Sequence, residues 1–222
     1  MGHREAKDAL FEGFAEVAKA LASGRRAELV DVLEQGERHV DQLAAEIGQS
    51  VANTSFHLRA LANAGLVTTR RDGTRVYYRL TSERVGELWE ALRDVAGAHH
   101  ARLDQLTEAY IGDRDGLEHV GWDELARRLA DGDVILIDVR PTAEYEAGHI
   151  AGARSIPPES LEELLSGLPG DVEVVAYCRG PYCLLADDAV RHLNRKGRPA
   201  RRLEGGFPQW RRAGLPVGTG TA

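Results

Sequence analysis

The chain has 222 residues, a net charge of −7, and only two cysteines, Cys178 and Cys183. This length suits two domains of common size. The longest apolar stretches are too short to cross a bilayer and no charged-then-apolar leader opens the chain, so a cytoplasmic protein without membrane association is expected. Two neighbouring cysteines exclude a disulfide-scaffolded secreted fold and suit thiol chemistry in a reducing compartment.

The first half of the chain has the spacing of amphipathic helices, each followed by a stop signal. These helices are expected over about 11–21, 25–34, 40–47, 51–64 and 82–110. In the fourth helix, Ser50 is a good N-cap, and Val51, Leu58 and Leu61 share an apolar face. Two strands over about 67–71 and 74–80 are joined by Asp72-Gly73, the strongest two-residue hairpin signal. Helix, tight turn, helix and basic hairpin is the order of a winged helix-turn-helix.

Polar and basic side chains mark the fourth helix and the hairpin as a DNA-binding surface. The outer face of the helix carries amides and hydroxyls, which read base edges, where a structural helix would carry Lys/Glu pairs. Residues 50–82 contain five arginines and one acid, a local charge of +4. The expected DNA contacts are Gln49, Ser50, Asn53, Thr54, Ser55, His57, Arg70, Arg71, Arg75 and Arg79. A small helical domain with an incidental hairpin is the alternative.

The run VDQLAAEIGQSVANTSFHLRALANAGLVTTRRDGTRVYYRL resembles the winged-helix signature of the ArsR/SmtB family, including its S-x-H-L step at 55–58. The resemblance covers about residues 5–110. It implies a homodimer, formed through the first and last helices, that binds double-stranded DNA at an inverted-repeat operator, usually as a repressor.

Many members of that family bind metals, at a site with two cysteines or at a site on the last helix. The segment GERHVDQLA lacks the two cysteines of the best-known site. The last helix offers Asp94, His99, His100 and Asp104, which could coordinate zinc, but their spacing departs from the family pattern of an Asp and a His two apart. A solvated helix face is the favoured interpretation, and no metal or cofactor is expected.

The mostly helical pattern ends at residues 111–118 and buried strands follow, so domains are expected at 1–112 and 113–222. An amphipathic helix precedes VILIDVR, a continuous apolar run typical of a buried parallel strand, and VEVVAY is a second such run. Short helices are expected over 161–165 and from 184. The predicted fold of this half is therefore α/β with a parallel sheet.

Cys178 directly follows the second buried strand and precedes a helix, which is where ligands bind in α/β sheets. The helix N-terminus and Arg179 should favour a Cys178 thiolate, and Gly180 lets backbone amides turn inward. These features predict that Cys178 is a nucleophile. For Cys183, a buried and inert cysteine is an equally open interpretation.

DVRPTAEYEAGHIAGARSIP and LEGGFPQWRRAGLPV resemble the signatures of rhodanese domains, and CRGPYC occupies the position of their active-site loop. The resemblance covers about residues 118–217. It implies that Cys178 carries a persulfide, that the loop amides cradle its outer sulfur, and that Arg179 attracts an anionic donor. The substrate-binding loop is then Arg179, Gly180, Pro181, Tyr182 and Cys183. Asp138 and Arg140 are expected to form a structural charged pair, and His149 to shape the loop rather than act as a base.

One departure concerns the last loop position, which is often basic in that family and is Cys183 here. This favours a two-cysteine switch over efficient thiosulfate turnover. The sequence therefore predicts a transcription regulator whose rhodanese domain senses sulfane sulfur or another thiol-reactive signal through Cys178 and Cys183. A sulfurtransferase that uses its winged helix mainly for dimerisation is the alternative, and an inactive rhodanese domain is a third interpretation.

Overall fold

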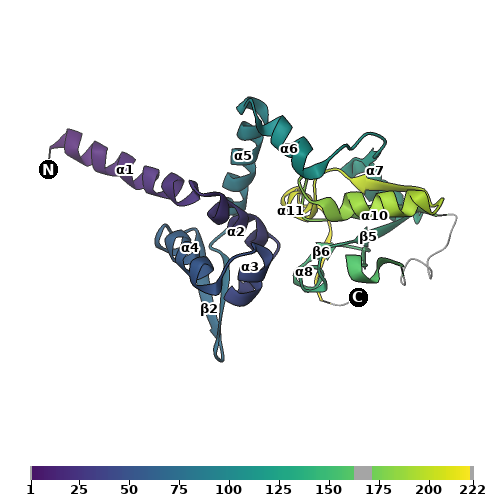
Figure 1. The fold of residues 1–222 in the computed structure, drawn as a ribbon, viewed down its shortest axis with the longest axis horizontal. Helices are drawn as coiled ribbons and strands as arrows, with labels where there is room; N and C mark the ends of the chain where they lie inside the picture. The colour runs from purple at the N-terminus through teal and green to yellow at the C-terminus, as the bar shows by residue number, and fades with distance from the viewer. Residues whose placement is uncertain (1, 163–171, 221–222) are drawn as a thin grey trace. The chain divides into compact units, whose positions relative to one another are not determined.

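The computed structural model describes residues 2–162 and 172–220, and the chain forms two compact units, Met1–His100 and Ala101–Ala222 (Figure 1). The domain boundary expected between residues 112 and 113 concerns which segments fold independently, and it stays a prediction. Within the described ranges, no helix has both the length and the apolar character that a membrane span requires.

The N-terminal unit is a winged helix-turn-helix, as predicted. Its helices are α1 (His3–Leu21), α2 (Gly24–Glu34), α3 (Val40–Glu46), α4 (Val51–Asn63) and α5 (Glu83–His99). Strands β1 (Arg38–His39), β2 (Val67–Asp72) and β3 (Arg75–Leu80) form an antiparallel sheet in the order β1-β3-β2. Leu29, Leu43, Leu58 and Leu61 are fully buried at its centre. Helix α1 projects from the rest of this unit (Figure 1) and leaves Leu10, Phe11 and Phe14 exposed.

Local signals explain how α4 and the hairpin form. The Ser50 side chain accepts a hydrogen bond from the Asn53 amide at 3.2 Å, which caps α4 as expected. Strands β2 and β3 are joined at Gly73, whose φ of 58° is in the left-handed region that glycine adopts without strain. The predicted hairpin is confirmed, but its two linking residues are Gly73 and Thr74 rather than Asp72 and Gly73, because Asp72 pairs with Arg75 at the end of the strands.

The single last helix expected over 82–110 is wrong. Helix α5 ends at His99, the backbone at His100 is extended, and α6 (Leu103–Ile111) starts after this break. No large apolar side chain occurs between Val95 and Leu103, so the helical periodicity has nothing to bury there.

The C-terminal unit is the predicted α/β fold. Its helices are α6, α7 (Trp122–Asp131), α8 (Thr142–Ala147), η1 (Pro158–Ser160), α10 (Leu184–Arg195) and α11 (Phe207–Arg212). Its strands are β4 (His119–Val120), β5 (Val134–Asp138), β6 (His149–Ile150), β7 (Arg154–Ser155), β8 (Glu173–Tyr177), β9 (Ala200–Leu203) and β10 (Val217–Gly218). A parallel sheet has the order β4-β9-β8-β5-β7, and β6 pairs with β10. The helix expected over 161–165 lies mostly outside the described residues.

Helices cover both faces of this sheet. Helix α10 packs on one face against Ile137, Val174 and Ala176, and Cys178 belongs to the same apolar cluster. Helices α7, α8 and α11 pack on the other face, where Trp210 is almost fully buried. The carboxyl end of β8 therefore delivers Cys178 to the start of α10.

Candidate functional site

The two cysteines lie in a tight loop between β8 and α10, here called the sulfur loop (residues 178–183). Cys178 is 1% exposed, whereas Cys183 is half-buried and is the N-cap residue of α10. The Cys178 sulfur lies 3.7 Å from the Cys183 carbonyl oxygen and 3.9 Å from that of Gly180. The turn thus folds back on Cys178 and brings Cys183 beside it, as a two-cysteine unit requires.

Gly206 and Phe207, which lie at the start of α11, pack against the backbone of the sulfur loop. The Phe207 amide donates a hydrogen bond to the Cys178 carbonyl at 3.1 Å. A Cβ at Gly206 would lie only 2.6 Å from the Arg179 carbonyl carbon and from the Gly180 Cα. Glycine at this position therefore allows two backbone segments to approach more closely than any side chain permits.

The two thiols are electrostatically coupled. Burial raises the pKa of the Cys178 thiol well above its ordinary value, and the hydrogen bond with Cys183 adds to this rise. The hydrogen bond donated by Cys178 lowers the pKa of Cys183 to about 7, and the backbone amides of Arg179 and Leu185 act in the same direction. Cys183 is therefore the more readily ionised of the two thiols, whereas the sequence predicted a Cys178 thiolate.

Arg179 anchors the sulfur loop. Its guanidinium pairs with Glu144 of α8, with Nη2 and Oε1 2.6 Å apart, and the Glu144 side chain is 2% exposed. Arg179 was expected to attract an anionic donor, but a buried carboxylate already compensates its charge. Glu144 lies in the run that resembles rhodanese domains, but the sequence did not indicate that its partner is Arg179, 35 residues away.

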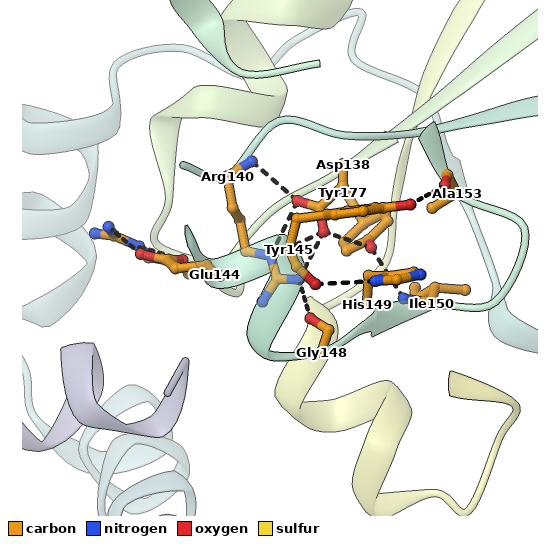
Figure 2. A network of polar contacts seen from close by, with 10 residues as sticks. Asp138, Arg140, Glu144, Tyr145, Gly148, His149, Ile150, Ala153 and Tyr177 are labelled. Carbon is orange, nitrogen blue, oxygen red and sulfur yellow. Dashed lines mark hydrogen bonds and ion pairs between the residues drawn. The ribbon is translucent and has the colours of Figure 1, made fainter. Parts of the chain in front are cut away.

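A buried polar network lies beneath the loop (Figure 2). Arg140 Nη2 donates to Asp138 Oδ2 at 2.6 Å, and both side chains are fully buried. The Tyr177 hydroxyl also donates to Asp138 Oδ2 at 2.6 Å, and Arg140 Nη2 donates to the Gly148 carbonyl at 2.7 Å. The structural charged pair predicted from the sequence is confirmed, and it fixes the ends of β5 and β8 on which the loop is built.

His149 has the packing of a structural residue, as expected. Its ring stacks on Tyr145 at a centroid distance of 3.8 Å, and its Nδ1 lies 2.9 Å from the Tyr145 carbonyl oxygen (Figure 2). It is 6% exposed. The ring therefore fills space between α8 and β6.

Asp187 in the first turn of α10 binds two arginines. This cluster was not predicted from the sequence. Its carboxylate accepts from Arg114 Nε at 2.6 Å and from Arg202 Nη1 at 2.7 Å, and the Asp187 side chain is fully buried. Arg191 of the same helix donates to the Asp113 carbonyl at 2.6 Å. The segment that follows α6 is thus fastened directly to α10, the helix that Cys183 precedes.

The DNA-facing side of α4 differs from the one expected. Thr54 is fully buried, so its expected contact with a base edge is wrong: the helix turns this side chain into the core. Val51, expected on the apolar inner face, is 42% exposed, because it starts the first turn, where α4 is not yet covered. His57 and Ser55 are half-buried, and Asn53 is exposed. The Gln49 side-chain oxygen accepts a hydrogen bond from Asn53 Nδ2 at 2.7 Å.

The hairpin arginines do not share one face. In the strand register Arg70 pairs with Tyr77 and Arg71 with Val76, so these adjacent arginines project to opposite faces. Arg70 is also held by Glu37 at 2.7 Å and by Asp72 at 3.2 Å. Arg71, Arg75 and Arg79 are exposed. These three remain the stronger candidates for phosphate contact.

The candidate metal ligands are spread over the helix break. Asp94 and His99 lie on α5, His100 lies in the extended turn, and Asp104 lies on α6. In the part of the chain that the structure describes, no three His, Cys, Asp or Glu side chains gather as a metal site.

These features define a class of protein: a DNA-binding regulator with a winged helix-turn-helix and an α/β domain that carries a cysteine loop. Residues 23–69 match the family of bacterial regulatory proteins called the arsR family, and residues 121–213 match the rhodanese-like domain. The HTH-type transcriptional regulator Rv0324 of Mycobacterium tuberculosis is 44% identical over 219 residues, covering 99% of this chain and 96% of the relative. The chain belongs to the arsR family of transcription regulators and carries a rhodanese-like domain.

Other relatives match one half each. A sulfurtransferase of Allochromatium vinosum is 36% identical over 97 residues, which cover 43% of this chain and 89% of that protein. The solution structure of the homodimeric winged helix-turn-helix domain of Mb0332 from Mycobacterium bovis is 43% identical, with a TM-score of 0.41. It covers 45% of this chain and 90% of that structure.

Proposed function

We propose that this regulator acts in the cytoplasm as a homodimeric repressor on an inverted-repeat operator, and that sulfane sulfur or another thiol-reactive signal at Cys178 and Cys183 changes its operator affinity. Exposed apolar side chains on α1 and α5 support contact between two copies through these helices. They are Leu10, Phe11, Phe14, Leu88, Leu92 and Val95. A twofold dimer presents two copies of α4 to successive major grooves.

The observation that carries the sensing role is the position of Cys183, which the turn brings back onto the buried Cys178 sulfur, 3.7 Å from the Cys183 carbonyl oxygen. Two cysteines held together in one loop can take up a sulfur atom and then form a bridge. With a persulfide donor RSSH, the Cys178 sulfur bonds to the outer donor sulfur, the donor S–S bond breaks, and RS⁻ leaves. The Cys178 proton passes to the Cys183 thiolate, which acts as the base. Cys178 is then the persulfide carrier, as the resemblance implied.

The second step closes the pair. The Cys183 thiol attacks the inner sulfur of the Cys178 persulfide, a Cys178–Cys183 disulfide forms, and hydrogen sulfide leaves with both protons. The persulfide donor is the oxidant and the two thiols are oxidised. Because Cys183 is the N-cap of α10, the bridge changes the backbone at the start of that helix.

The route from the sulfur loop toward the DNA-binding half runs through α10. Arg114 and Asp113 contact Asp187 and Arg191 of this helix, and Leu117 is buried in the same cluster as Cys178. A displaced α10 therefore displaces the segment that continues into α6. A coupling of about 1–3 kcal/mol through such a route changes affinity about 5- to 150-fold.

The test measures DNA affinity in different sulfur states. Duplexes enriched from a random library by the reduced full-length protein serve as the probe, and affinity is compared before and after treatment with a low-molecular-weight persulfide. We expect at least a fivefold change for the wild type, and none for the Cys178→Ser, Cys183→Ser double variant. Mass spectrometry of Cys183→Ser should find the added sulfur on Cys178.

A second variant tests the route. Arg114→Met should load sulfur normally and yet show a smaller change in DNA affinity, while Arg127→Met, which alters an exposed arginine of α7, should respond as the wild type does. Equal affinity of the wild type in all sulfur states would refute the sensing role. Sulfur found on Cys183 and never on Cys178 would overturn the assignment of the carrier.

A further inference from the structure

The large apolar side chains exposed in the described part of the N-terminal unit fall into three groups. Those on α1 and α5 form the surface assigned above to the second copy of the chain. The third group consists of Val51 and Phe56, which are 42% and 58% exposed and both lie on α4. Phe56 is therefore a large exposed apolar side chain on the helix that follows the tight turn, and dimerisation through α1 and α5 does not account for it.

Phe56 lies at the centre of the exposed face of α4. Ala52 lies one turn before it and Arg59 nearly one turn after it, and both are exposed. Its ring lies edge-to-face with that of the neighbouring His57, with centroids 5.5 Å apart. Leu58 and Leu61 on the opposite side of α4 are fully buried. The core is thus complete without Phe56, and the ring points away from it.

The surroundings of Phe56 suit a polyanion. The sequence of α4 contains no Asp or Glu, Arg59 is exposed on the same face, and Arg71, Arg75 and Arg79 are exposed on the hairpin. Positive charge around an apolar centre matches the major groove, where phosphates flank the base edges. The apolar group that bases present in this groove is the C5-methyl group of thymine.

We propose that Phe56 is a specificity-determining residue that packs on thymine methyl groups in the major groove, with Ala52 extending the apolar surface. This inference rests on the proposed binding of α4 to an operator. It replaces the hydrogen bond between Thr54 and a base edge that the sequence indicated. Asn53, bonded to Gln49, remains the polar member of the reading face.

The experiment removes the methyl group from the DNA and the ring from the protein. Full-length reduced protein enriches duplexes from a random library, and the enriched duplexes are then made with deoxyuridine in place of thymidine, which deletes only the methyl. A buried methyl contributes about 0.8 kcal/mol, so we expect about a fourfold loss of wild-type affinity for one contact and about fifteenfold for two half-sites.

Phe56→Ala should bind the thymidine duplex more weakly and should no longer distinguish it from the deoxyuridine duplex. Arg71→Ala is the matched control: it should weaken both duplexes and keep their ratio. An unchanged ratio in Phe56→Ala, or equal wild-type affinity for both duplexes, would overturn the proposal, and normal DNA binding by Phe56→Ala would point to a protein partner for this ring. Failure of the wild type to enrich any sequence would refute operator binding itself, and with it this reading by Phe56.

Discussion

Replacing Asp187 by alanine should strongly destabilise the C-terminal unit. The carboxylate is fully buried and accepts from Arg114 at 2.6 Å and from Arg202 at 2.7 Å, and the Arg202 side chain is only 2% exposed. Burial already lowers the pKa of Arg202, and the Asp187 charge opposes this. Because arginine stays charged, the variant would leave a buried cation without its anion. Breaking such a pair costs about 3–5 kcal/mol, and two hydrogen bonds to a charged group, at about 1.5–3 kcal/mol each, lead to the same range.

Asp188→Ala is the matched control, one residue away on the same helix. Its carboxylate is 70% exposed and lies 3.7 Å from Arg191, so its loss should change the free energy of unfolding by less than about 0.5 kcal/mol. Urea unfolding of the full chain, followed by tryptophan fluorescence, measures both, since Trp122 and Trp210 report on this unit. A loss below about 1 kcal/mol for Asp187→Ala, or equal losses for the two variants, would refute the buried triad.

Three further predictions concern the sulfur loop and the hairpin. The rate at which iodoacetamide alkylates Cys183 should rise through about pH 7 and fall about tenfold per pH unit below it; Cys178→Ala should move this midpoint upward because the hydrogen bond donated to Cys183 is lost, and an unmoved midpoint would contradict the coupling. Gly206→Ala should cost about 1–3 kcal/mol and stop sulfur uptake, since a Cβ there meets the loop backbone at 2.6 Å; wild-type uptake would contradict this. Arg71→Ala should weaken binding to all duplexes and reduce the slope of log affinity against log salt concentration by about 0.9 per hairpin. Arg70→Ala should have a smaller effect, because Glu37 and Asp72 compensate the charge of Arg70. Equal slopes for the two variants would count against the ion pairs of Arg70.

Much of the fold could be predicted from local signals. The hairpin turn at Gly73 needs only the conformational freedom of glycine, and the Ser50 cap needs only an amide three residues away. Runs such as 134–138 are apolar on both faces, so they predict a buried parallel strand before any partner is known. The cysteine loop between strand and helix was likewise visible in the sequence.

Side-chain roles were less predictable, since burial depends on what packs against a helix. Thr54 and Phe56 are two residues apart on α4, and a pattern of polarity assigned the first to DNA and overlooked the second. Packing against neighbouring elements buries Thr54 completely and leaves Phe56 exposed.

The sequence by itself therefore determined the two domain types, the order of their elements, and the residues available for thiol and DNA chemistry, because turns, caps and apolar periods act within a few residues. Only the tertiary structure decided which charges meet. Glu37 reaches Arg70 across 33 residues, and Asp187 reaches Arg114 across 73. The same folding buries Cys178 and makes Cys183 the more readily ionised thiol, because desolvation and hydrogen bonding depend on neighbours that the chain brings together only when folded.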